Sequence, residues 1–315
     1  MRLAVYLPLI LPLTALPVAR LASDHLHPRT ATRLLTAVAV VLAACSTLCL
    51  ALLMVVGTAQ VPGNPLPDGW ADPEVRDEVP LVRVSGSIAI AGLLVVLVAA
   101  AVVLRRAARV RRDALKAIDG LPDDGGVAVL PDAEPYAFAL PGRRPRVVVS
   151  TGMLACLDAR ERRALIAHER AHLARRHDRV LLLVRLAAAS QPLLRPLRTA
   201  ISYTVERWAD EEAAEAVGDR RTTAHAVGKA ALATRRPARP GLPAFAAPAS
   251  GSTPGQVPRR VAALLGPTPD TAWPAPRSRT GLAAIVAAAG TTVSVVSALN
   301  ATVALFVILK AATAL

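Results

Sequence analysis

The sequence HERAH at residues 168–172 places two histidines four positions apart, with a glutamate directly after the first. Positions four apart lie on one face of a helix, about one turn from each other. His168 and His172 can therefore share one zinc ion, and Glu169 can reach a water bound to that ion. The alternative interpretation is an exposed, charged helix face that happens to carry two histidines, and the sequence downstream argues against it.

A second predicted helix supplies the ligand that this pair still lacks. A catalytic zinc takes three protein ligands and keeps a fourth position open. Glu206, which lies 34 residues after His172, is the candidate for the third ligand. Asp210 follows on the same face and can accept the outer N–H of a ligand histidine, which fixes the tautomer of the ring. Taken alone, this acidic segment is typical of a solvated helix face, but beside HERAH we interpret Glu206 as a ligand.

The residues around HERAH predict one helix from Ala159 to Arg176. Asp158 and Glu161 have the spacing of a capping box, with Asp in place of the usual Ser or Thr. His177 comes five residues after His172. We therefore expect it to point away from the pair and to act as a cation at the helix C-terminus.

Four stretches of the chain resemble integral-membrane gluzincin peptidases. Their active-site helices are similar to AHERAHLARRHD at residues 167–178 and VERWADEEAA at residues 205–214. The strands that precede the motif there are similar to YAFAL at residues 136–140 and VVVSTGML at residues 147–154. The chain most resembles the BlaR–MecR type, with the HtpX and CAAX prenyl protease type as a near relative. The resemblance covers about residues 105–235 and the general layout of membrane spans.

This resemblance implies zinc ligands at His168, His172 and Glu206, which hold one Zn²⁺ per chain, and a catalytic role for Glu169. We therefore expect a zinc metalloendopeptidase, in which a zinc-activated water hydrolyses the peptide bond and Glu169 acts as general base. The expected partner is a protein or peptide substrate.

Tyr203 and His225 are candidates for a further oxyanion donor, although a structural role is the commoner one for such residues.

The chain departs from the BlaR–MecR type in one respect. Sensors of that type carry a penicillin-binding domain after their last span, and this chain ends at Leu315 without one. β-Lactam sensing is therefore in doubt.

Four segments are apolar enough to span a bilayer, in a chain that is 53% hydrophobic but only 3% aromatic. We expect the first to be a retained span rather than a signal peptide, because prolines interrupt it and no small-residue cleavage site follows. The four segments lie at about Leu3–Val18, Leu34–Gly57, Ser87–Leu104 and Gly281–Leu309.

The loops between these segments carry a charge bias that sets their orientation. Arginines gather directly after Leu104, which places that end in the cytoplasm, whereas the acidic, Pro-rich loop from Thr58 to Gly86 should lie outside. We therefore expect a multi-pass protein of the cell membrane, with its active site on the cytoplasmic side and both termini outside.

The formal net charge of +14 is compatible with binding to nucleic acid or to an anionic membrane surface. The basic residues cluster beside the predicted spans and lack interleaved aromatics. We therefore expect a lipid bilayer with anionic headgroups as their partner, and no direct binding of nucleic acid.

Between the third and fourth spans the sequence predicts a small α+β unit. Three short strands precede the HERAH helix, at Val127–Leu130, Tyr136–Leu140 and Arg146–Val149. The resemblance implies that an edge strand of their sheet binds the substrate backbone. Residues 179–201 are interpreted as a buried or membrane-dipping helix rather than a full span. The expected fold is a mainly α membrane protein, with about four transmembrane helices and a cytoplasmic zincin-like α+β metallopeptidase domain.

The expected organisation has four parts. Residues 236–278 hold ten of the 26 prolines and predict a linker, with a short helix around Pro258 to Leu265. The parts are an N-terminal membrane region with three transmembrane helices at 1–104, a cytoplasmic zinc peptidase domain at 105–235, this linker, and a C-terminal transmembrane helix at 279–315.

Three functions fit these features. The first is regulatory proteolysis of a transcriptional repressor or membrane-associated regulator, as the BlaR–MecR resemblance implies. The second is membrane-protein quality control, as in the HtpX type. The third is a non-catalytic membrane scaffold with a structural zinc site, against which the intact set of catalytic positions argues.

Overall fold

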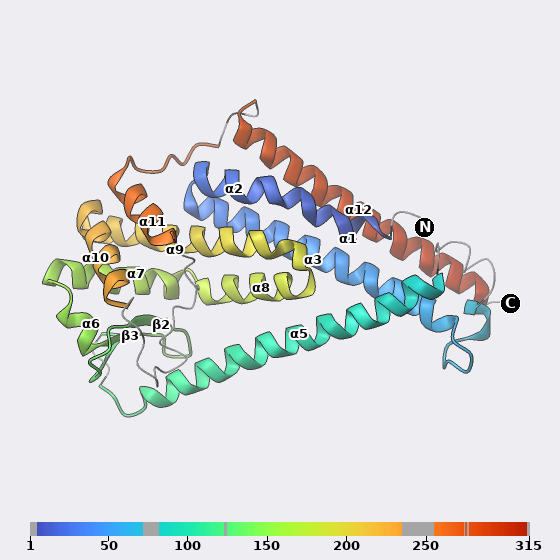
Figure 1. The fold of residues 1–315 in the computed structure, drawn as a ribbon, viewed down its shortest axis with the longest axis horizontal. Helices are drawn as coiled ribbons and strands as arrows, with labels where there is room; N and C mark the ends of the chain where they lie inside the picture. Colours follow the sequence, from blue (N-terminus) through green and yellow to red (C-terminus); the bar gives the residue numbers. More distant parts are fainter. Residues whose placement is uncertain are drawn as a thin grey trace.

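The computed structural model describes residues 5–71, 82–122, 125–234, 255–273, 275 and 277–313. Within these residues the chain is mainly helical, with one small sheet (Figure 1). Four helical segments are long and apolar enough to cross a membrane, which confirms the four predicted apolar segments. They are Leu7–His25, Pro28–Ala59, Val84–Ala117 and Arg279–Ala311.

The first of these segments is broken where its prolines stand. Pro8 and Pro12 lie at the start of short helical pieces, where a missing backbone N–H is tolerated. The pieces are α1 (Leu7–Ile10), the 3₁₀ helix η1 (Leu11–Thr14) and α2 (Ala15–His25). The other three segments are single helices, α3 (Pro28–Ala59), α5 (Val82–Ala117) and α12 (Arg279–Thr313), and the 3₁₀ turn η2 (Asp68–Ala71) follows α3.

Helix α5 connects the apolar region to the sheet. Its 36 residues span about 54 Å, well beyond the roughly 30 Å of a bilayer core. Five of its six arginines lie in its second half, and the strands follow its end (Figure 1). Helix α5 therefore extends beyond its apolar stretch and carries the sheet at its end.

The sheet has three strands, β1 (Val127–Leu130), β2 (Ala137–Leu140) and β3 (Arg146–Ser150), in the order β1-β3-β2. Strand β1 pairs with β3 in parallel, and β2 pairs with β3 antiparallel, so that Ala139 lies opposite Val147. The three predicted strands are confirmed to within a residue. Strand β2 is an edge strand, and it lies against the HERAH helix.

The HERAH helix is α7 (Ala159–Ala174), and its predicted capping box is present. It ends two residues before the predicted end. Arg176 then adopts a left-handed conformation with φ of 52°, which turns the chain into the next helix. The remaining elements are α6 (Thr151–Ala155), α8 (His177–Ser190), η3 (Pro192–Leu194), α9 (Arg195–Val217), α10 (Arg220–Thr234) and α11 (Gln256–Leu265).

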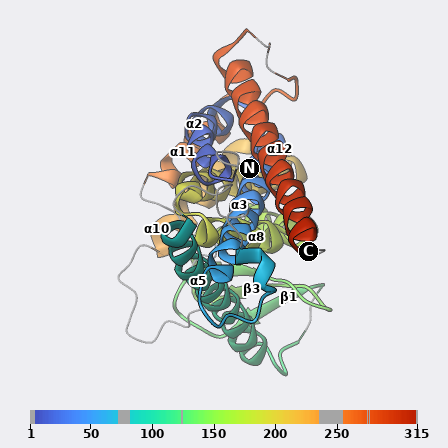
Figure 2. The same ribbon diagram turned by 90° about the vertical axis from the view of Figure 1, so that its right-hand side faces the viewer.

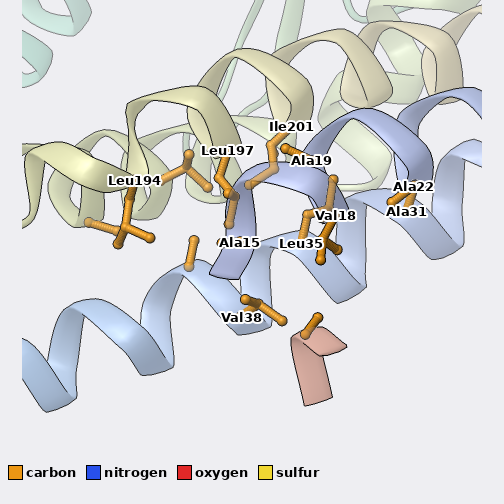
Figure 3. Packing of buried hydrophobic residues seen from close by; sticks show 14 of the residues in the cluster. Ala15, Val18, Ala19, Ala22, Ala31, Leu35, Val38, Leu194, Leu197 and Ile201 are labelled. Carbon is orange, nitrogen blue, oxygen red and sulfur yellow. The ribbon is translucent and has the colours of Figure 1, made fainter. Parts of the chain in front are cut away.

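Helices α8 and α9 form a hairpin that packs along α2 and α3. Leu194, Leu197 and Ile201 of the hairpin join one apolar cluster with residues of α2 and α3 such as Val18 and Leu35 (Figure 3). Figure 2 shows α3 and α8 between α12 on one side and α5 with the sheet on the other. The elements that carry the site are thus fixed against the long apolar helices.

The tip of this hairpin lies beside the middle of α3. The side chain of Gln191 donates to the Leu9 carbonyl at 3.2 Å and to the Ser46 hydroxyl at 3.3 Å. These buried polar contacts satisfy the carboxamide at the point where the chain reverses. Residues 179–201 therefore comprise most of α8, the turn through η3 and the start of α9. They form two helices rather than the single helix expected, which agrees with the interpretation that they are not a full span.

The short helix predicted in the linker is confirmed as α11, which lies against α9 and α10. Residues 235–254 of the predicted linker lie outside the described residues.

Candidate metal centre

Helices α7 and α9 bring three potential ligands together. The Nε2 atoms of His168 and His172 lie 3.1 Å apart. The Glu206 carboxylate lies 3.5 Å from the first of these atoms and 3.7 Å from the second. All three side chains are largely buried, with exposed fractions of 9%, 13% and 10%. Two residues one helical turn apart and a third from a neighbouring helix therefore converge on one point.

These distances fit a tetrahedral zinc site. Ligand atoms about 2.0–2.1 Å from a zinc ion lie about 3.3 Å from one another in tetrahedral geometry. The donor atoms of this group lie within 4.8 Å of one another, and two imidazoles with one carboxylate form a common ligand set of catalytic zinc. His168, His172 and Glu206 thus form a metal-binding group.

Asp210 lies behind the first ligand. Its Oδ1 atom is 3.0 Å from Nδ1 of His168 and faces the ring nitrogen that points away from the metal side. Burial disfavours the charged form of His168, but hydrogen bonds and charges from Asp210 and Glu206 outweigh it and raise the pKa of His168 to about 10. The protein groups therefore favour a positive charge at this point, which a metal cation also supplies.

Arg260 of α11 joins both carboxylates. Its guanidinium donates to Asp210 from Nε at 2.8 Å and from Nη2 at 2.6 Å. Its Nη1 atom lies 3.0 Å from Oε2 of Glu206. Burial opposes the charge of both carboxylates, but Arg260 reverses that effect, lowering the pKa of Glu206 well below its usual value and that of Asp210 to about 2. The two acids are thus held ionised in a buried site.

His177 corrects a prediction from the sequence. We expected it to point away from the histidine pair and to act as a helix C-terminal cation. It is instead fully buried, and its Nδ1 atom lies 2.9 Å from Nδ1 of His172. Burial lowers its pKa to about 3, so the ring is neutral. The physical reason is the early end of α7 and the left-handed turn at Arg176, which bring His177 back toward the site.

Glu169 lies between the metal-binding group and the sheet. Its carboxylate accepts a hydrogen bond from the backbone N–H of Ala139 in β2. Part of its surface stays accessible, but desolvation by the surrounding protein atoms disfavours the charged form and raises the pKa of Glu169 to about 7. Glu206 adds to this effect, while the charge of His168 opposes it.

The two candidates for an oxyanion donor lie in different surroundings. The Tyr203 ring lies under the guanidinium of Arg259, 4.4 Å from its centroid, and lines a pocket between α2, α9 and α11. His225 is exposed on α10. The role of either residue in catalysis stays a prediction.

Sequence reasoning missed the contributions of Arg260 and His177 to the site. Arg260 was assigned to a linker, although the apolar residues around it predict the short helix that carries it. Its position 50 residues after Asp210 leaves no local spacing that reveals the pairing. For His177, the spacing of five residues from His172 indicated a different direction, whereas the left-handed turn at Arg176 brings the ring back to the site.

Residues 103–191 match the model of Peptidase family M48. The matched segment contains the sheet and the HERAH helix, and it ends before Glu206. No match was found among curated proteins or among solved structures. The match and the His-His-Glu group agree on the chemistry, which confirms the predictions of a zinc cofactor and of peptidase activity.

Proposed function

We propose that this membrane zinc metalloendopeptidase of the M48 type hydrolyses extended protein segments at the cytoplasmic surface of the membrane. The observation that carries the proposal is the position of Glu169, between the metal-binding group and the edge strand β2. Peptide hydrolysis needs a general base, a bound metal ion and a site that holds the substrate backbone. Glu169, the metal-binding group and the edge of β2 lie on one side of α7 and can supply all three.

In this proposal Glu169 is the general base. A zinc ion held by His168, His172 and Glu206 would supply an activated water and polarise the scissile carbonyl. Glu169 takes the proton of the attacking water and passes it to the leaving amine. The Ala139 N–H orients the carboxylate for both transfers, and Asp210 fixes the tautomer of His168.

The register of the sheet indicates which backbone groups meet the substrate. Directly before β2, the Tyr136 carbonyl accepts from the Ser150 N–H of β3, and the Tyr136 N–H donates to Oγ of Ser150. Tyr136 thus turns its backbone groups toward β3, so Ala137 and Ala139, which alternate with it, direct theirs away from β3. The Ala139 N–H turned toward Glu169 agrees with this alternation. An extended substrate can therefore pair with this edge as an additional strand, and its backbone then lies beside Glu169.

The placement beside the membrane rests on three supports. The hairpin of α8 and α9 packs along α2 and α3, and its tip contacts Ser46 in the middle of α3. The arginines of the second half of α5 favour the cytoplasmic side, with both termini outside. The same arginines are suited to anionic lipid headgroups. Substrates that lie near the bilayer are therefore favoured over freely diffusing ones.

Two biological roles fit this activity. The resemblance to the BlaR–MecR type supports regulatory proteolysis of a repressor or a membrane-associated regulator. The match of residues 103–191 to Peptidase family M48 supports the second role, HtpX-like quality control of membrane proteins. The two roles differ in the number of substrates, one or a few in the first and many in the second.

A comparison of cells with the wild-type chain and cells with Glu169→Gln distinguishes these roles. The variant keeps the fold and the metal ligands but lacks the base. Regulatory proteolysis predicts that one or a few full-length proteins accumulate in the variant and that their fragments disappear. Quality control predicts that many damaged membrane proteins accumulate, more so under heat. Identical protein and fragment profiles in both cells would contradict the proposed peptidase function.

A further inference from the structure

We propose that His177 is a positioning residue for the zinc ligand His172. Nδ1 of its ring accepts a hydrogen bond from Nδ1 of His172 and thereby directs Nε2 of that ligand toward the metal. This inference rests on the metal-binding group of the proposed peptidase, and it concerns how that group is held.

The direction of the hydrogen bond follows from the tautomers. The Nδ1 atoms of His172 and His177 lie 2.9 Å apart, so one proton lies between them. His172 faces His168 and Glu206 with its Nε2 atom. A neutral imidazole that binds a metal through Nε2 carries its proton on Nδ1. His172 must therefore donate, and Nδ1 of His177 must accept.

The surroundings hold His177 in one position. It is the first residue of α8, directly after the left-handed Arg176. Its ring packs at 59° to the Trp208 indole, with the centroids 4.9 Å apart. Trp208 is fixed in turn, because its indole N–H donates to Glu212 at 2.7 Å. The acceptor for His172 is therefore placed by backbone geometry and by packing.

The surroundings of Nε2, the other ring nitrogen of His177, indicate that His172 requires the hydrogen-bond acceptor at Nδ1. If Nδ1 accepts, Nε2 carries the proton, and Nε2 is buried with no hydrogen-bond partner in the part of the chain that the structure describes. A buried N–H without a partner is costly. An apolar side chain would fill the same space without that cost. Packing alone does not explain a histidine here, but a requirement for an acceptor at Nδ1 does.

The two ligand histidines are thus supported differently. Nδ1 of His168 faces the carboxylate of Asp210 at 3.0 Å, whereas Nδ1 of His172 faces a neutral imidazole. Support of ligand histidines by such partners typically changes metal affinity by about 10–100-fold. His177 should therefore contribute to zinc binding as Asp210 does, without adding a charge.

The test compares three variants of the full-length chain in detergent. His177→Leu and His177→Phe remove the acceptor and keep apolar packing, and His177→Asn places a carbonyl oxygen near the position of Nδ1. The zinc dissociation constant is measured by competition with a chelator. We expect the Leu and Phe variants to bind zinc about 10–100-fold more weakly than the wild type, and Asn to recover at least about tenfold of the loss. His25→Leu, at an exposed position on α2, is the matched control and should bind zinc like the wild type.

Two further readouts separate positioning from folding. Thermal unfolding in excess chelator reports the fold without metal, and the visible spectrum of the Co²⁺-substituted chain reports ligand geometry. A loss of zinc affinity and an altered Co²⁺ spectrum, at an unfolding temperature near that of the wild type in chelator, support positioning. Unchanged zinc affinity in the Leu and Phe variants, or tighter binding in these than in Asn, would overturn it. A wild-type chain that binds no zinc would instead contradict the proposed function.

Discussion

Arg260 shows how single residues balance charge in the site. Its guanidinium contacts both Glu206 and Asp210, and 9% of its side chain is exposed. Two carboxylates close together in a buried site repel each other and lose hydration, so each needs a compensating partner. A metal ion and Arg260 compensate Glu206 from two sides, whereas Asp210 depends on Arg260 and His168.

We therefore expect Arg260→Met to destabilise the chelated protein by about 3–5 kcal/mol, because it removes the guanidinium that compensates the charge of two buried carboxylates. Added zinc should restore part of this loss, since the metal supplies positive charge beside Glu206. Thermal unfolding with chelator and with zinc measures both effects. Arg260→Lys should lose less, because the charge stays while the bidentate geometry is lost.

The neighbouring Arg259 provides the control. It pairs with Asp24, and about half of each side chain is exposed. Exposed ion pairs contribute about 0–1 kcal/mol, so Arg259→Met should have a small effect. Equal losses for the two arginines would show that the contacts of Arg260 with the site do not stabilise the protein.

The sequence predicted those site residues whose spacing is local. His168, Glu169 and His172 lie within one helical turn, and their periodicity indicates a shared face. Arg260 could not be predicted in this way, because its partners are set by the packing of α11 on α9. His177 was placed wrongly, because one left-handed residue redirects the chain and helical periodicity does not give the direction of a side chain beyond such a turn.

At the scale of elements, two features position the site: the edge strand β2 and the crossing of α3 and α5. The strands were predicted to within a residue, because short apolar runs bounded by Pro and Gly turns define them. The hairpin of α8 and α9 was harder to place, since arginines interrupt its apolar run. Its buried face can be identified only from the structure, in which the hairpin packs along α2 and α3.

Ala137→Pro tests the role of the β2 edge. Ala137 directs its N–H away from β3, and proline is tolerated at such edge positions, so the fold should persist. We expect the value of kcat/KM for an unfolded protein to fall by about tenfold, mainly through a higher KM, because one backbone donor to the substrate is lost. Ala137→Val keeps the N–H and should retain most of the activity. Equal activity of the Pro variant and the wild type would contradict substrate binding at this edge.

The contact of Gly57 with Gly86 sets how closely α3 and α5 approach. A Cβ atom on Gly57 would lie 2.3 Å from Cα of Gly86, which is closer than any real contact. Small residues at such crossings let membrane helices pack backbone to backbone. Since α5 carries the sheet, the crossing also influences where β2 lies.

Gly57→Val should therefore separate the two helices and lower the unfolding temperature in detergent. Gly92→Val on α5 is the matched control, because a Cβ atom there meets only the side chain of Leu50 at 3.7 Å. We expect the control to unfold near the wild-type temperature. Similar unfolding temperatures for Gly57→Val and Gly92→Val would show that the close crossing does not stabilise the protein.

At the scale of the whole molecule, the chain joins a peptidase centre to a set of long apolar helices. The composition and the four apolar segments predicted this division. The way the parts join could not be predicted, because it depends on contacts between distant segments, such as Gln191 with Leu9 and Arg260 with Asp210. The metal centre is therefore held by elements that are themselves fixed to the apolar helices.

The most direct test of the account is to measure zinc content and cleavage of an unfolded model protein by the full-length wild type and by Glu169→Ala. We expect about one zinc per chain in both, because the ligand set of His168, His172 and Glu206 is intact in each. Cleavage should fall by about 10²–10⁴-fold in the variant, which lacks the general base. Absence of zinc from the wild type, or equal cleavage by the two proteins, would contradict the central claim.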